Sequence, residues 1–401
     1  MTALDVGGTR SPAAVRERRG LLLAFAAFGL FWGAWAAVLP DVRGRSDLTD
    51  GSLGLALGAI AVAALPAMPL AGRLVDRYGP RLLLPGALGA FAVVTALLGF
   101  AAPPAALVGA LVLLGATTGV LDVTVNAATA AWERVESGRL MSAGHGCFSL
   151  GVLAGAALTG FARGAGAGPA AVLGVVATVV GASALAQPAY RRTDGAAAPP
   201  AAERGARRLA PVLLGLGAVV GCSFLIEDAV QSWSALHLEG SLDAPPWVGG
   251  LGPGLFAGTM AAGRLGAHLL VRPGREAAAV GVGGVVTGLG LLVLAAAPTA
   301  WVGLAGAAVA GAGVSVLAPT LLSAVGARSE PGRQGADLAL VTAFGYSGFV
   351  LGPLLVGLLS AALSLPVALG LLAVLASAIA AAGPLLLRTR PRASARPEGA
   401  R

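Results

Sequence analysis

Four ionisable side chains inside long apolar stretches of the 401-residue sequence are candidates for a functional role. They are Asp122, His145, Glu227 and Asp228. A charged group is costly in apolar surroundings, so its presence there usually marks a site that binds a solute or carries a proton. Carboxyl and imidazole groups do both, because they gain and lose protons and form strong hydrogen bonds. The chemistry that this set suggests is proton transfer or recognition of a polar solute.

The first candidate group is centred on Asp122. Asn126 follows it by four residues, so the two side chains share one face of a helix. Asn126 and His145 both lie about five residues, or ~7–8 Å of rise, from the expected ends of their helices. The three side chains could therefore meet as a relay for a proton or a polar solute. The alternative is a hydrogen-bonded network that only fixes helix packing.

The second candidate group is centred on Glu227, which lies about 18 residues, or ~27 Å of rise, from the start of its apolar stretch. Asp228 and Ser232 share a helix face that Glu227 does not occupy. No arginine lies in the same stretch. We expect Glu227 to bind a substrate or a proton, whereas Asp228 either assists it or faces water in an outer vestibule.

Three tryptophans are candidates for contact with a ligand. Trp32 and Trp35 are three residues apart in the first apolar stretch, and Trp233 follows Ser232. Tryptophan in a membrane helix usually lies at the interface with water, so a central one is informative. These rings would form an aromatic wall against an apolar or sugar-like face of a ligand. The alternative is packing against lipid or other helices.

The composition indicates a chain that faces lipid. Hydrophobic residues make up 56% and charged residues 11% of the sequence, whereas soluble domains carry about 25% charged residues. All 27 basic residues are arginine, which we interpret as the coding bias of a GC-rich bacterial genome. They lie in short clusters between apolar stretches, which argues against a nucleic-acid partner. Cys147 and Cys222 lie in apolar stretches, so no disulfide, metal site or cofactor is expected.

Apolar runs of about 20 residues, the length that crosses a bilayer as a helix, recur along the chain. In the first half they cover 20–39, 52–75, 82–102, 105–131, 140–163 and 167–187. In the second half they cover 209–237, 247–271, 277–297, 300–326, 335–359 and 366–387. We predict an all-α integral membrane protein with twelve transmembrane helices in two pseudo-symmetric six-helix bundles. The bundles are expected to comprise 1–187 and 209–401, joined by a cytoplasmic linker at 188–208.

The distribution of arginine tests this number of helices. If the N-terminus is cytoplasmic and the helices alternate in direction, 24 of the 27 arginines fall on the cytoplasmic side. The other three are Arg43, Arg45 and Arg163. Cytoplasmic segments of membrane proteins carry an excess of basic residues. We therefore predict a multi-pass protein of the bacterial cytoplasmic (inner) membrane with both termini in the cytoplasm.

A polar turn between the second and third apolar runs resembles the signature of the major facilitator superfamily. It reads Gly72-Arg-Leu-Val-Asp76-Arg77-Tyr-Gly79-Pro-Arg81. The resemblance implies that Gly72 lets two helices approach closely and that Gly79 permits a tight turn. Asp76, Arg77 and Arg81 would form a gating latch between the two halves. The alternative is an ordinary polar turn.

Several further stretches resemble the MosC-like, or rhizopine-transport-like, branch of that superfamily. They are WGAWAAVLP (32–40), MPLAGRLVDRYG (68–79), GVLDVTVNA (119–127), MSAGHGCFSLG (141–151) and EDAVQSWSALHL (227–238). In the last stretch Asp228, Ser232 and His237 replace the Gly, Asp and Tyr typical of the branch. The carboxylate of Asp228 would then take the place of the acidic residue expected at Ser232.

The resemblance implies a secondary transporter that moves a small organic solute by alternating access. The expected partners are a small-molecule substrate, protons and the lipid bilayer, and the protein is expected to be monomeric. Proton-linked import is favoured, with proton-antiport export of drugs or metabolites as the alternative. The antiporter signature expects proline where Ala156 stands, and the intact form, Gly348 to Pro353, is interpreted as a packing kink.

Two other classes of protein are less compatible with the sequence. A membrane enzyme would need a nucleophile with a base, or a metal cluster, and the three histidines lie far apart in the chain. No enzymatic activity and no catalytic residue is therefore predicted. A non-transporting receptor or scaffold would carry substantial regions outside the membrane, and the sequence contains none of that length.

Overall fold

The structure is a computed structural model that describes residues 11–136, 139–188, 211–270, 274–329 and 334–388. Within these ranges it is all-helical. Six helices form the first half: α1 (Pro12–Arg45), α2 (Asp50–Tyr78), α3 (Pro80–Phe100), α4 (Pro104–Glu136), α5 (Met141–Gly164) and α6 (Pro169–Leu185). The second half contains α7 (Pro211–Ser241), α8 (Pro246–Gly249), α9 (Leu251–Leu270), α10 (Glu276–Ala295), α11 (Ala300–Val314), α12 (Leu317–Arg328), α13 (Gln334–Ala362) and α14 (Leu365–Arg388).

These segments make the twelve predicted passes. In the described residues, ten helices are long and apolar enough to cross a membrane, with α11 and α12 counted as one. The α6 helix is apolar but has only 17 residues, and α8 with α9 completes the set. The break between α11 and α12 has a local cause, because Pro319 has no N–H to donate to the carbonyl of Ser315. The predicted fold class is confirmed.

Proline determines where several of the helices begin. The residues at the first helical position are Pro80, Pro104, Pro169, Pro211 and Pro246. The first turn of a helix leaves its N–H groups unpaired, so proline loses nothing there and its fixed φ angle suits the helix. Proline therefore fixes the residue at which each of these helices begins.

The two halves repeat one packing pattern. In the first half α1 packs on α5, α2 on α4 and α3 on α6; in the second α7 packs on α13, α9 on α11 and α10 on α14. Glycines allow the closest pairs to touch. A Cβ atom at Gly151 would lie 2.3 Å from the carbonyl oxygen of Ala26, and one at the matching Gly348 would lie 2.1 Å from that of Gly221. The similar glycines of the two halves therefore serve close helix packing.

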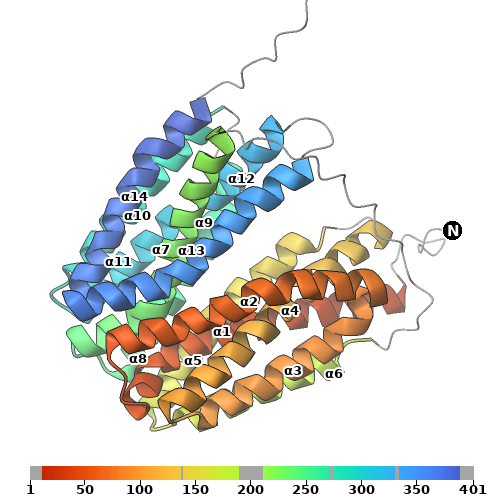
Figure 1. Cartoon of the computed structure of the whole chain (residues 1–401), viewed down its shortest axis with the longest axis horizontal. Helices are drawn as coiled ribbons and strands as arrows, with labels where there is room; N and C mark the ends of the chain where they lie inside the picture. The colour runs from red at the N-terminus through yellow and green to blue at the C-terminus, as the bar shows by residue number, and fades with distance from the viewer. Residues whose placement is uncertain (1–10, 137–138, 189–210, 271–273, 330–333, 389–401) are drawn as a thin grey trace, which may run out of the picture.

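The two bundles approach each other at one end and diverge towards the other (Figure 1). They meet where α1, α5 and α7 end, and we call this the closed end. We call the other the terminal end, because helix α1 begins and helix α14 ends there. Between the bundles α2 packs against α13, and α5 packs against α8 and α9. Most of the predicted linker at 188–208 lies outside the described residues, so these domain boundaries stay a prediction.

Candidate functional site

Glu227 of α7 forms an ion pair with Arg264 of α9. The Arg264 Nη2 atom donates to Glu227 Oε2 at 3.1 Å. Glu227 is buried, whereas about a third of the Arg264 side chain, 34%, is exposed. No arginine lies in the apolar stretch of Glu227, as the sequence indicates, but the fold supplies one from the neighbouring helix. An arginine held by a buried carboxylate, yet still accessible, is suited to exchange that partner for another.

Two further ionisable groups lie close to this ion pair. Asp228 follows Glu227 directly, and the two carboxylates repel each other electrostatically. His145 of α5 lies within electrostatic range of Arg264, although α5 and α9 belong to different bundles. Ser232, the other predicted member of this group, is half-buried and forms no hydrogen bond with the described residues.

Asp122 of α4 is held from both bundles. Asn126 Nδ2 donates to Asp122 Oδ1 at 3.1 Å, and the hydroxyl of Tyr346 in α13 donates to Asp122 Oδ2 at 2.9 Å. His145 does not complete this group in the structure. Its ring packs on Phe25 with 5.2 Å between centroids and is otherwise exposed. The predicted Asp–Asn pair is therefore present, but its third member is Tyr346, because α4 and α5 contact each other little.

Three buried polar atoms beside these carboxylates have no partner among the described residues. They are Thr118 Oγ1, Ser223 Oγ and Arg264 Nε. Thr118 precedes Asp122 by one helical turn, and Ser223 precedes Glu227 by one turn, so each shares the face of its carboxylate. Buried polar atoms are nearly always hydrogen-bonded. Each of these atoms is therefore able to accept or donate a further hydrogen bond.

The tryptophans pack differently from an aromatic wall. Trp233 is fully buried and its indole N–H donates to the carbonyl oxygen of Pro353 at 3.2 Å. Trp35 is also buried, stacked on Phe31 at 6.4 Å. Trp32 is half-buried and contacts Phe31 edge to face at 5.3 Å. Trp35 and Trp233 are buried between helices in this conformation, as the alternative of helix packing expects. Of the three tryptophans, Trp32 keeps a partly accessible surface.

His237 explains one departure from the branch pattern. It is fully buried, and its Nε2 atom lies 2.9 Å from the carbonyl oxygen of Leu294 near the end of α10. That carbonyl has no helical donor, because position 298 is proline. His237 therefore caps α10, which is a structural task.

The gating motif lies at the terminal end, between α2 and α3. Gly79 has φ +82°, so it makes the tight turn expected of it. Arg81 Nε pairs with Glu17 Oε1 of α1 at 2.7 Å, within its own bundle. Asp76 and Arg77 are exposed. Gly72 makes no close helix contact, because nothing lies within 4 Å of a Cβ at that position. The expected contact at Gly72 is therefore wrong for this conformation, and a latch across the bundles stays a prediction.

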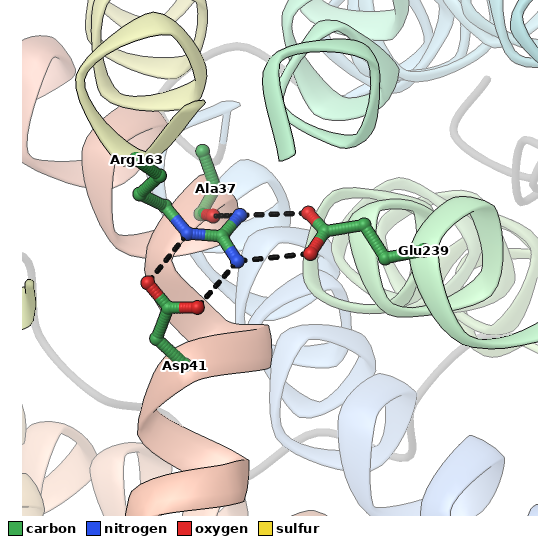
Figure 2. Close-up of polar contacts among 4 residues, drawn as sticks. All are labelled: Ala37, Asp41, Arg163 and Glu239. Atoms are coloured by element: carbon green, nitrogen blue, oxygen red, sulfur yellow. Dashed lines mark hydrogen bonds and ion pairs between the residues drawn. The ribbon is translucent and has the colours of Figure 1, made fainter. Parts of the chain in front are cut away.

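A buried ion cluster joins the bundles at the closed end (Figure 2). The Arg163 side chain of α5 is 2% exposed and binds two carboxylates. Its Nε and Nη2 atoms donate to Asp41 of α1 at 2.7 and 2.6 Å. Its Nη1 and Nη2 atoms donate to Glu239 of α7 at 2.7 and 2.9 Å. Nη1 also donates to the carbonyl oxygen of Ala37 at 2.7 Å. Asp41 lies in the same bundle as Arg163, and Glu239 lies in the other.

A second joint closes the same end between α2 and α13. Asp50 pairs with Arg43 of α1 at 3.0 Å, and its second oxygen accepts a hydrogen bond from Ser360 of α13. Beside it, a Cβ at Gly54 would lie 2.8 Å from Gly357 Cα. Sequence reasoning identified neither joint. A signal was present, however, because Arg43 and Arg163 are two of the three arginines outside the predicted cytoplasmic side.

Two six-helix bundles that meet at one end, with paired charges inside, define a membrane transporter fold. The family model of the Major Facilitator Superfamily matches residues 20–280 and 268–401. The chain therefore belongs to the major facilitator superfamily and is a multi-pass membrane protein of transporter type.

Curated relatives and solved structures agree with this assignment. The chain is 31% identical over 373 residues to an uncharacterised MFS-type transporter of Yersinia pestis, covering 91% of this chain and 94% of that protein. It is 29% identical over 345 residues to the membrane protein MosC of Rhizobium meliloti, covering 84% and 82%. A bacterial homologue of the human lysosomal transporter Spinster, in an inward-facing and occupied conformation, superposes with a TM-score of 0.75 at 15% identity, covering 95% and 98%. The nucleoside transporter NupG gives 0.71 at 12% identity, covering 95% and 100%.

Proposed function

We propose that the protein is a secondary active transporter that moves a small organic solute by alternating access, coupled to protons. The observation that carries the proposal is the ion pair of Glu227 with Arg264, at 3.1 Å within apolar helices. Buried charges in membrane proteins are expensive and mark pathways for solutes and protons. The unpaired atoms of Ser223 and Arg264 beside this pair support a polar ligand there.

The chemistry follows from competition for one carboxylate. When Glu227 is ionised, Arg264 satisfies it. When Glu227 takes a proton, the carboxyl loses its charge and the guanidinium of Arg264 becomes free to bind an acceptor group of the solute. Release of the proton restores the ion pair and expels the solute. One proton and one solute are thereby linked through a single side chain, which is what coupling requires.

Alternating access is supported by the arrangement of the two ends. Ion pairs and close glycine contacts join the bundles at the closed end, whereas the bundles diverge at the terminal end (Figure 1). With both termini in the cytoplasm of a bacterial inner membrane, as the arginine distribution predicts, this conformation is inward-facing. The reverse conformation would open the closed end and bring the terminal ends together.

The experiment begins with a ligand. Purified protein is screened by thermal shift against sugars, inositol derivatives, amino acids and drugs. The solute that stabilises it is then tested in proteoliposomes with an imposed pH gradient. Glu227→Gln, which mimics the protonated carboxyl at nearly constant volume, should abolish gradient-driven accumulation and preserve binding and exchange. The matched control is Asp243→Asn, an exposed carboxyl in the loop after α7, which should transport like the wild type.

The direction of proton movement separates import from export. A pH-sensitive dye inside the vesicles should report acidification as solute enters if the protein is a symporter. Alkalinisation on solute entry would instead identify the antiport exporter of drugs or metabolites. If Glu227→Gln concentrates solute as well as the wild type, the proposed proton site is wrong, and Asp122 with Tyr346 becomes the next candidate.

A further inference from the structure

The last turn of α1 contacts three separate parts of the closed end. Asp41 accepts two hydrogen bonds from Arg163 of α5. Arg43, two residues on, pairs with Asp50 at the start of α2. Arg45 donates to the carbonyl oxygens of Gly99 and Ala101 at the end of α3, at 2.6 and 3.1 Å. The first two contacts lead to the two joints between the bundles, and the third fixes the turn to its own bundle.

Both joints share one design. Each has a holder on α1, a central ion and a partner in the second bundle. In the first joint Asp41 holds Arg163, whose other partner is Glu239. In the second joint Arg43 holds Asp50, whose other partner is Ser360. When the bundles separate at this end, Glu239 and Ser360 leave while the holders stay.

The holders lower the cost of opening. An arginine as buried as Arg163 would be strongly destabilised if its sole counter-ion departed. Asp41 prevents this, because it keeps two hydrogen bonds to the guanidinium within the first bundle. Glu239 has its own compensation, since a cavity of about 360 Å³ between the ends of α1 and α7 is lined by Glu239, Arg43 and Asp47. Water in that cavity would solvate the released carboxylate.

We propose that the segment Asp41–Arg45 is a coupling turn that makes the two joints open together, with Arg43 as its positioning residue. Release of Glu239 leaves Asp41 as the remaining carboxylate partner of Arg163, so the guanidinium shifts towards Asp41 and the turn moves with it. The movement reaches Asp50 through its ion pair with Arg43, and the hydrogen bond from Ser360 to Asp50 then breaks. This inference rests on the proposed alternating access, but it concerns how the closed end opens and not what is carried.

The test uses spin labels and needs no ligand. In full-length protein with Cys147→Ala and Cys222→Ala, one label pair at Ala165 and Ala296 reports the first joint. A second pair at Leu55 and Leu363 reports the joint between α2 and α13; all four labelled positions are exposed. Glu239→Gln should move both distance distributions to longer values.

The Arg43→Met background then tests the role of the turn. There, Glu239→Gln should still shift the first pair. Its effect on the open-to-closed ratio of the second pair should fall by at least about twofold, the lower range for coupled neighbouring sites. Arg43→Lys keeps the charge and should retain the coupling. Arg45→Met, on the same turn, should retain it too, because the hydrogen bonds of the Arg45 side chain to described residues all go to the end of α3 and the residue after it.

Two results would overturn the inference. In the first, Glu239→Gln shifts only the Ala165–Ala296 pair in the otherwise native chain, so the joints are independent. In the second, both pairs shift equally with Arg43→Met, so the bundles move as rigid bodies and the turn is not needed. Neither result involves solute uptake, so the transport proposal stands or fails separately in the vesicle assay.

Discussion

Arg163 of α5 and Glu239 of α7 face each other through two N–H···O contacts, at 2.7 and 2.9 Å, across the boundary between the bundles. This two-pronged geometry matches the fork of the guanidinium to the two oxygens of a carboxylate, the strong form of such a pair. Asp41 binds the remaining side of the same guanidinium. One buried cation therefore pairs with two carboxylates from different bundles and helps to hold the end shut.

Replacement of this cation should weaken the closed end. Arg163→Met leaves Asp41 and Glu239 facing each other without a counter-ion. The loss of one partner of a buried pair costs about 3–5 kcal/mol, and less where a carboxylate is partly exposed, as Asp41 is. We expect a lower melting temperature in detergent. The exposed Arg134→Met serves as control, and equal behaviour of the two variants would contradict the role of Arg163.

Substitution of glycine by alanine should destabilise the protein where two helices touch and have little effect where the glycine faces open space. A methyl group at Gly155 would lie 2.2 Å from the carbonyl oxygen of Leu30, whereas Gly146 on the same helix has nothing within 4 Å. Overpacking typically costs about 1–3 kcal/mol. Gly155→Ala should therefore lower the melting temperature, and Gly146→Ala should preserve it. A Gly155→Ala protein as stable as the wild type would show that α1 and α5 adjust freely.

The gating motif should matter for conformational change and not for insertion. Asp76→Asn removes only a charge, and Asp76 is exposed at the terminal end in this conformation. We expect normal expression but slower interconversion between the two states, measured as a lower transport rate with unchanged solute binding. Glu136→Gln at the same end is the control. If Asp76→Asn transports solute at the wild-type rate, the Asp76 charge plays no part in the conformational change and the motif serves only to orient the helices in the membrane.

The predicted orientation is testable by labelling from outside the cell. A cysteine at Gly195, in the predicted cytoplasmic linker, should not react with an impermeant reagent. A cysteine at Ala165, exposed in the short α5–α6 connection at the closed end, should react. Efficient labelling at Gly195 would reverse the topology and with it the inward-facing interpretation.

Much of the fold could be predicted from the sequence because membrane helices satisfy their own backbone hydrogen bonds. Runs of apolar residues then indicate each pass, and the arginine clusters indicate its direction. Glycine recurs at matching positions of the two halves, Gly151 and Gly348, where the helices pack closely. The break between α11 and α12 was not predicted. It lies at Ser315, whose carbonyl oxygen has no helical donor because residue 319, four positions later, is proline.

The site was predicted only in part, because its pairs come from helices distant in sequence. Helical spacing placed Asn126 beside Asp122, but it could not place Tyr346, which lies 224 residues further on. Glu227 was singled out as a buried carboxylate, but helical spacing could not place Arg264 beside it. Its long side chain reaches Glu227 only because α7 and α9 pack together. Local patterns identify such groups but not their partners.

Alternating access is tested most directly by locking the closed end. Gly51 of α2 and Ala361 of α13 belong to different bundles, and a Cβ at Gly51 would lie 3.1 Å from Ala361 Cβ. That separation is close to the range of about 3.5–4.5 Å between the Cβ atoms of a disulfide. Gly51→Cys with Ala361→Cys leaves Asp50 and Ser360 intact and should form a disulfide on oxidation. Either substitution alone controls for the oxidant.

The measurement is uptake of the identified solute into proteoliposomes before oxidation, after oxidation and after reduction. We expect full inhibition by the disulfide and recovery on reduction, because the solute crosses only if the closed end opens. Binding of the solute from the terminal end should survive oxidation. Undiminished uptake with the disulfide fully formed would contradict alternating access across this joint.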